Sequence, residues 1–152
     1  MEQLRIFAAT ETDIPFIAEV YEENIHRLHG VKRDESTWKQ LLSNKDSSYF
    51  IVTADEPVAW FRTEIEDGIF WLGMLQVKPD YQRRGVGKAV LSAAEHMARE
   101  QGFTAVGIHT TEDNLAARAL YAHCGYAVTE VGPCTTADGV DRVGYTYEKG
   151  LT

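Results

Sequence analysis

Residues 75–88 read LQVKPDYQRRGVGK, and the remaining sequence is best understood around this stretch. It begins as an apolar strand, breaks at Pro79, and turns through Gly85 and Gly87 into a long helical pattern. The first turn of a helix has N–H groups without partners inside the helix, and the helix dipole places partial positive charge there. Glycine has no Cβ to hold a phosphate away from those groups. The stretch therefore predicts a site for a pyrophosphate-bearing ligand, bound mainly by main chain.

Positively charged side chains surround this turn in an otherwise acidic chain. Arg83, Arg84 and Lys88 flank the glycines, whereas the whole chain has 23 acidic and 15 basic residues and a net charge of −8. Guanidinium groups match the geometry of phosphate especially well. The acidic balance disfavours a general nucleic-acid binder, which would normally be basic. An acidic surface suits a cationic partner such as an amine, and solubility explains it equally well.

Two better-known glycine motifs do not match. A Walker A loop needs Ser or Thr after Gly-Lys, but Ala89 follows Lys88, and this disfavours a nucleotide hydrolase. A dinucleotide fingerprint needs a third glycine, but Val90 stands at that position. The structural alternative is a helix start whose glycines allow tight packing.

Length and composition predict one domain, residues 1–152. Hydrophobic content of 44% and charged content of 25% are ordinary for a globular protein. No apolar run approaches the ~20 residues that span a bilayer. The first residues carry acids where a signal peptide carries bases, so we expect a cytoplasmic location without membrane contact. Cys124 and Cys134 have no metal-ligand or redox spacing, so we expect free thiols and no metal.

Hydrophobic periodicity divides the chain into alternating strands and helices. Helices are predicted at residues 14–30, 34–42, 85–101 and 114–124, and strands at 4–8, 48–53, 58–65, 69–77, 104–109, 126–131 and 142–148. Turn signals at residues 54–57 and 66–68 predict an antiparallel arrangement of three consecutive strands. Strand, helix, strand order across residues 69–109 predicts a parallel crossover. The expected class is α/β, with a mixed sheet and helices on both faces.

Two blocks of this sequence together resemble the GNAT superfamily of N-acetyltransferases. They are Leu75-x-Val77-x-Pro79-x-x-Gln82-x-x-Gly85-x-Gly87 and Asn114-x-x-Ala117-x-x-x-Tyr121-x-x-x-Gly125-Tyr126. The resemblance covers nearly the whole chain. It implies a mixed, mostly antiparallel central sheet in which one parallel strand pair is splayed.

The resemblance also implies a co-substrate, acetyl-CoA, and residues that would bind it. The pyrophosphate would be held by the loop Gln82, Arg83, Arg84, Gly85, Val86, Gly87 and Lys88. The main chain of Leu75 and Val77 would pair with the pantetheine arm. Asn114, Ala117 and Tyr121 would contact the cofactor from the following helix.

In the implied reaction, a primary amine attacks the thioester directly, without a covalent enzyme intermediate. The N–H of Val77 would stabilise the negative oxygen that develops, and Tyr121 would protonate the leaving thiolate as general acid. Structural alternatives are a core tyrosine at Tyr121 and a helix N-cap at Asn114. Cys124 is expected to be a core thiol rather than a nucleophile.

The general base is the weakest part of the resemblance. Several family members have a glutamate or histidine on the central strand, but residues 69–77 contain no titratable group, and Trp71 stands at about the comparable position. Glu64 on the preceding strand is the preferred candidate, and a water chain competes with it. The other candidates are Glu112, His109, Glu22 and His26.

An alternative function is a regulatory module that binds acyl-CoA with little or no turnover, supported by the missing carboxylate on the central strand. For an enzyme, the expected acceptor is a small-molecule or peptide amine. Because many relatives pair through C-terminal strands or helices, a homodimer is a further expectation.

Overall fold

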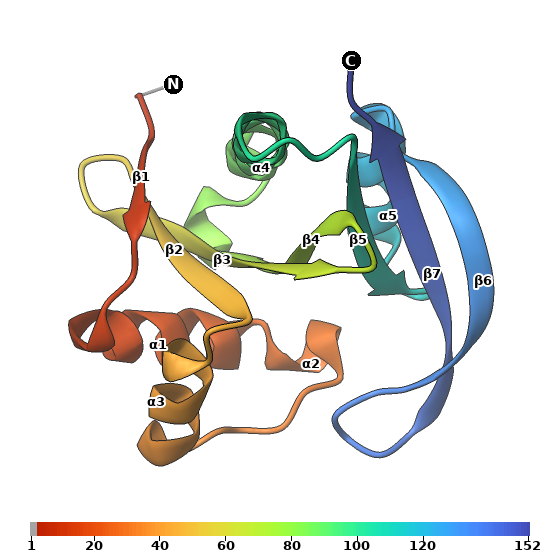
Figure 1. Ribbon diagram of the computed structural model, residues 1–152. Helices are drawn as coiled ribbons and strands as arrows, with labels where there is room; N and C mark the ends of the chain where they lie inside the picture. Colours follow the sequence, from red (N-terminus) through yellow and green to blue (C-terminus); the bar gives the residue numbers. More distant parts are fainter. Residues whose placement is uncertain (1–2) are drawn as a thin grey trace.

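A seven-stranded sheet forms the centre of the protein, which the computed structural model describes over residues 3–152. The strand order is β1-β2-β3-β4-β5-β7-β6, and only the β4–β5 pair among these neighbours is parallel (Figure 1). The strands are β1 (Arg5–Ala8), β2 (Ser47–Thr53), β3 (Pro57–Glu66), β4 (Ile69–Val77), β5 (Ala105–Thr111), β6 (Ala127–Thr135) and β7 (Asp141–Gly150). The expected mixed, mostly antiparallel sheet is confirmed.

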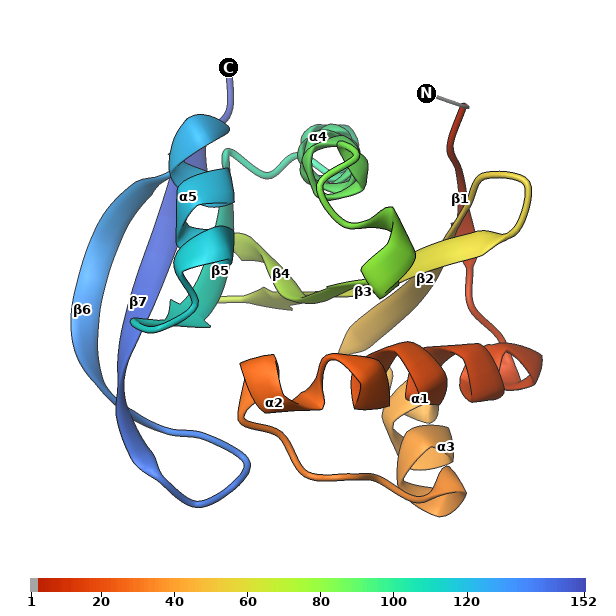
Figure 2. The ribbon, with the colours of Figure 1, turned by 180° about the vertical axis from the view of Figure 1, so that it is seen from behind.

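Helices cover both faces of this sheet, as predicted. Figures 1 and 2 show α1 (Ile14–Glu23), α2 (Ile25–Leu28) and α3 (Glu35–Ser43) on one face, with α4 (Val86–Glu100) and α5 (Leu115–His123) on the other. Two short 3-10 helices, η1 (Glu11–Asp13) and η2 (Pro79–Tyr81), precede α1 and α4. None of the helices in residues 3–152 has the length and apolar character needed to cross a membrane.

Alternation along β3 divides the hydrophobic core between the two faces. Trp60 packs with Trp38 and Tyr21 under α1 and α3, whereas Phe61 packs with Val90 and Leu72 under α4. Successive strand side chains point to opposite faces, so each face has its own core.

The first predicted helix is interrupted at Asn24. The Asn24 side chain is buried and donates hydrogen bonds to Gln76 Oε1 and to the carbonyl oxygen of Val77, both at 3.1 Å. Asn24 has φ −104° and ψ 3°, outside helical values, and α2 begins after it. A buried amide must satisfy its donors, and contact with β4 does so while ending α1. The expectation of one helix over residues 14–30 was wrong at this residue.

The last two strands are longer than predicted. Pairing continues from Ala127 opposite Glu148 to Thr135 opposite Asp141, so the chain reverses only at residues 136–140. Thr136 Oγ1 donates to Asp138 Oδ1 at 2.5 Å, and the Val140 N–H donates to the same oxygen at 3.2 Å. These local bonds stabilise the turn, whereas Gly132 and Pro133, expected in a loop, lie within β6.

An extra residue in β4 separates this strand from β5. Leu72 lies opposite Thr63 and Met74 opposite Arg62, so Gly73 has no partner on β3. Such a bulge bends the strand that contains it. Pairing of β4 with β5 covers only Phe70 to Leu72, and the parallel pair is splayed beyond that point, as the resemblance implied.

We predict that Gly107→Ala destabilises the protein by about 1–3 kcal/mol, because the added methyl overpacks a rigid aromatic ring. A Cβ on Gly107 would lie 2.6 Å from Trp71 Cε3 and would also clash with Cζ3. Urea unfolding measures the change. The matched control is Gly150→Ala, where nothing lies within 4 Å of the added Cβ. Equal midpoints for the two variants would contradict the packing argument.

Candidate active site

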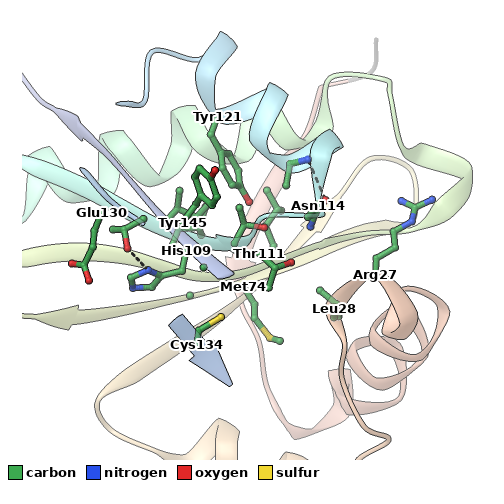
Figure 3. A pocket seen from close by; sticks show the side chains of 18 of the residues that line it. Arg27, Leu28, Met74, His109, Thr111, Asn114, Tyr121, Glu130, Cys134 and Tyr145 are labelled. Carbon is green, nitrogen blue, oxygen red and sulfur yellow. Dashed lines mark hydrogen bonds between the residues drawn. The ribbon is translucent and has the colours of Figure 1, made fainter. Parts of the chain in front are cut away.

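A cavity of about 460 Å³ opens where β4 and β5 part. Residues of α2, β4, β5, α5, β6 and β7 line it, and Figure 3 shows their side chains converging from these elements. The cavity therefore connects the splayed strand pair with helices of both faces and with the β6–β7 hairpin.

Four of the predicted cofactor residues meet in this cavity: Leu75, Asn114, Ala117 and Tyr121. Asn114 is also the N-cap of α5, because its Oδ1 accepts a hydrogen bond from the Ala117 N–H at 3.3 Å. Asn114 therefore has the structural role of a helix N-cap and also forms part of the cavity wall.

The main chain of Leu75 faces away from β3. The N–H of Lys78 donates to the Val58 carbonyl at 2.9 Å. Since hydrogen-bonded pairs alternate along an antiparallel ladder, Gln76 and Met74 bond to β3, while Leu75 and Val77 direct their main-chain groups to the opposite side. Beyond Leu72 that side is no longer paired with β5, so an extended ligand could pair there.

The Val77 carbonyl and the Gln82 side chain form hydrogen bonds with other residues of the protein. The Val77 carbonyl accepts from Asn24 Nδ2 at 3.1 Å and from Gln82 Nε2 at 3.0 Å. Gln82 Oε1 accepts from Arg27 Nη1 at 2.7 Å. Val77 does not line the cavity, whereas Leu75 does. The Gln82 side chain therefore stabilises the end of β4 through a hydrogen bond.

The glycine loop leads into α4 with three cationic side chains exposed. The first intrahelical bond runs from the Ala89 N–H to the Gly85 carbonyl at 3.0 Å, so the N–H groups of Val86, Gly87 and Lys88 precede the ladder. Gly85 has φ 86°, and Arg83 also adopts a left-handed conformation with φ 62°. Arg83, Arg84 and Lys88 are exposed, and Val86 is buried in the core.

Gly87 allows tight helix packing, the structural explanation for the glycines that the sequence offered as an alternative to ligand binding. A Cβ there would lie 2.9 Å from Leu120 Cδ2, at the contact between α4 and α5. Gly85 permits the turn, and Gly87 permits the two helices to approach closely. The N–H groups that precede the α4 ladder and the exposed cations of this loop suit a diphosphate, so the residues present fit the expected cofactor.

Tyr121 is buried, with 7% of its surface exposed, and its ring packs edge-on against Tyr147 at 5.5 Å between centroids. Burial raises the pKa of the Tyr121 phenol above its ordinary value, because a phenolate would lose its hydration. The nearby Tyr147 hydroxyl acts in the same direction. The Tyr121 hydroxyl therefore remains protonated throughout the neutral range.

A buried polar cluster fixes the end of α5, from which Tyr121 projects. Glu95 on α4 accepts from the Tyr126 hydroxyl at 3.0 Å and from Lys149 Nζ at 3.0 Å. Lys149 Nζ also donates to the Cys124 carbonyl at 3.0 Å, and the Tyr126 N–H donates to the Tyr121 carbonyl at 3.0 Å. Burial first, and then the Glu95 carboxylate, raise the pKa of Tyr126. Cys124 lies within this structural region.

An imidazole and a carboxylate line the side of the cavity that β5 and β6 form: those of His109 on β5 and Glu130 on β6. His109 Nδ1 lies 3.1 Å from Thr146 Oγ1, and its ring stacks on Trp71 with 4.5 Å between centroids. Glu130 lies opposite Thr146 in the β6–β7 ladder, and Thr146 opposite His109 in the β5–β7 ladder. The three side chains therefore share one face of the sheet, as Figure 3 shows for Glu130 and His109.

The other candidate bases do not line the cavity. Glu64 lies on β3 with Oε1 3.8 Å from Arg62 Nη2, and its side chain is 38% exposed. Glu22 Oε1 lies 3.8 Å from Lys32 Nζ. His26 and Glu112 are exposed.

Sequence reasoning missed Glu130 and Arg27 as residues of the cavity wall. Neither belongs to a motif. The β6–β7 hairpin brings Glu130 to the cavity, and the break at Asn24 does the same for Arg27, so no local pattern could have identified them.

The fold and the cavity define a class: α/β proteins with a split central sheet and a helix N-terminus beside the split. Residues 14–126 match the acetyltransferase (GNAT) family, and because this match covers more than half of the chain, the chain belongs to that family.

The individual relatives are similar either over a short stretch of sequence or at low sequence identity. The GCN5-related N-acetyltransferase 4 of Arabidopsis thaliana, a chloroplastic protein, is 32% identical over 59 residues, which cover 39% of this chain but only 20% of the relative. The ribosomal-protein-S18-alanine N-acetyltransferase of Escherichia coli has a TM-score of 0.78 at 22% identity, covering 99% of this chain and 95% of that one. PaiA N-acetyltransferase of Thermoplasma acidophilum, in complex with coenzyme A, has a TM-score of 0.76 at 20% identity, covering 98% and 99%. At these identities the structural matches support the shared fold.

We predict that the raised pKa of Tyr121 makes the protein less stable at alkaline pH. The unfolded phenol ionises near its ordinary pKa while the folded phenol stays neutral, so stability present below about pH 10 falls as pH rises above it. Urea unfolding at pH 8 and pH 11 measures this loss. Tyr121→Phe should lose less stability between these two pH values than the unsubstituted protein. An equal loss in both would contradict the burial of a neutral phenol.

Proposed function

We propose that this protein transfers an acetyl group from acetyl-CoA to a primary amine by direct attack. One observation carries the proposal: the cavity at the β4–β5 split places a buried, protonated Tyr121 and the free main-chain side of Leu75 on one side, with His109 and Glu130 on another. These groups are an acid, a main-chain donor and two proton acceptors, which acyl transfer to an amine requires.

The glycine loop and the start of α4 would bind the cofactor. The N–H groups of Val86, Gly87 and Lys88, together with the exposed Arg83 and Arg84, provide donors and charge for its diphosphate. Bound at this position, acetyl-CoA supplies a thioester whose carbonyl carbon is open to attack by an amine. The CoA complex of a structural relative supports this assignment.

In this proposal the oxyanion donor is the N–H of Leu75. Sequence reasoning chose Val77; we prefer Leu75 because it lines the cavity and Val77 does not. A main-chain donor aimed at developing negative charge is typically worth ~3 kcal/mol of the activation barrier.

Tyr121 donates the proton that the departing thiolate of CoA needs. Its raised pKa keeps that proton available at neutral pH, and its place in the cavity wall directs it to the reacting centre. A positioned acid of this kind accelerates a reaction by about 10²–10⁴-fold.

His109 removes the proton that the amine must lose. Its Nδ1 lies within hydrogen-bonding distance of Thr146 Oγ1, and with the ring proton on Nδ1 donated to this hydroxyl, Nε2 presents a lone pair. Stacking on Trp71 holds the ring orientation. Glu130, on the same sheet face, provides negative charge that attracts the amine as an ammonium ion before its deprotonation.

Thiol release from acetyl-CoA across a panel of primary amines tests the proposed activity. We expect acceptor-dependent release of free CoA, and a fall of about 10²-fold or more in kcat for Tyr121→Phe, with CoA affinity retained. Calorimetry with CoA measures the affinity.

Tight CoA binding without amine-dependent release would instead identify the acyl-CoA-binding module considered above. Full activity of Tyr121→Phe at neutral pH would remove Tyr121 as the acid while leaving the transferase activity in place.

We predict that His109→Gln lowers kcat/KM at neutral pH by about 10²-fold and abolishes the acidic limb of its pH profile, because glutamine cannot accept the proton. Glu64→Gln is the matched comparison on the same sheet. Since Glu64 lies outside the cavity, this variant should keep the acidic limb. If Glu64→Gln lost the limb and His109→Gln kept it, the base first suggested by the sequence would be correct.

A further inference from the structure

Arg27 lies at the cavity wall, where several nearby basic side chains are paired with a carboxylate but its own guanidinium is not. It extends from α2 together with Leu28, and both residues line the cavity. Lys32, Lys78 and His29 each lie within 4 Å of a carboxylate, those of Glu22, Glu19 and Asp113 respectively. In the part of the chain that the structure describes, no carboxylate lies within 4 Å of the Arg27 guanidinium.

The Arg27 guanidinium is held by a network of neutral amides. Its Nη1 donates to Gln82 Oε1 at 2.7 Å, and Gln82 Nε2 donates to Asn24 Oδ1 at 3.2 Å and to the Val77 carbonyl at 3.0 Å. Asn24 in turn donates to Gln76 Oε1, and both Asn24 and Gln76 are buried. These contacts orient the group without neutralising its charge.

A guanidinium held in this way is suited to bind an anion. It has five N–H donors in a planar fork, and a carboxylate, like a phosphate, can accept two parallel hydrogen bonds from such a fork. Pre-organisation reduces the entropy lost when that ligand binds. Although the whole chain has a net charge of −8, an arginine without an acidic partner attracts an anionic group locally.

The opposite side of the cavity has the reverse charge. Figure 3 shows Glu130 and Arg27 on opposite sides, with His109 and Met74 between them. A ligand that spans the cavity would therefore meet an acidic side chain at one end and a guanidinium at the other.

We propose that Arg27 selects acceptors that carry a carboxylate in addition to the reacting amine. The inference rests on the proposed transferase function, because it assigns the amine end to Glu130 and His109 and the carboxylate end to Arg27. The carboxylate could belong to a free amino acid or to an acidic residue near the N-terminus of a peptide, and both sources present the same chemistry to Arg27.

Matched acceptors test the proposal. One pair is a free amino acid and its carboxamide; the other is two short peptides with Glu or Gln as the second residue. For at least one pair, we expect kcat/KM to favour the carboxylate form by about 10- to 100-fold. Arg27→Gln should remove most of this preference. Arg5→Gln, an exposed arginine on β1 outside the cavity, is the control and should retain it. Whichever pair shows the preference identifies the source of the carboxylate.

Calorimetry with the CoA-loaded protein gives a second measurement that does not depend on turnover. If no amine is acetylated, carboxylate-dependent binding that Arg27→Gln abolishes would still support the selectivity while the transferase proposal fails. Two results would overturn the inference. One is equal kcat/KM and equal binding for acid and amide. The other is a loss of CoA affinity in Arg27→Gln with the acid preference unchanged, which would assign Arg27 to the cofactor phosphates beside Gln82.

Discussion

The candidate site depends on one extra residue in a β-strand. Gly73 interrupts the β3–β4 ladder, and beyond it β4 no longer pairs with β5. A side chain at this residue would meet the Arg62 guanidinium, since a Cβ would lie 2.7 Å from Arg62 Nε, so glycine leaves the space in which Arg62 packs. The bulge bends the strand and frees the main chain of Leu75 on its β5 side. The split of the sheet is therefore built into the backbone of β4.

A small network of side-chain amides, two of them buried, connects the two faces of the sheet at this split. Asn24 interrupts the first helix, Gln76 and Val77 belong to the end of β4, and Gln82 begins the loop that leads to α4. Hydrogen bonds among uncharged groups orient side chains at a smaller desolvation cost than buried charges would incur. The same network reaches Arg27, so the glycine loop and one wall of the cavity share a common support.

Most regular elements could be predicted because their signals are local. Alternating apolar residues indicated the strands, and glycines with the helical spacing that follows indicated α4. The family resemblance also implied that Leu75, Asn114, Ala117 and Tyr121 would share one site, and all four line the cavity. The interruption at Asn24 was missed because the apolar spacing continues through it, and only contact with β4 explains why its amide leaves the helix.

The linear order of residues was enough to predict the α/β arrangement, the glycine turn before α4 and the family resemblance, since propensity, spacing and turn chemistry act between near neighbours. The folded arrangement was needed to identify the other residues of the cavity wall. His109, Glu130 and Arg27 come from β5, β6 and α2, far apart along the chain, and their meeting depends on strand register and on the Gly73 bulge. Register places each side chain on a particular face of the sheet, and it follows from the packing of the whole sheet rather than from any short segment.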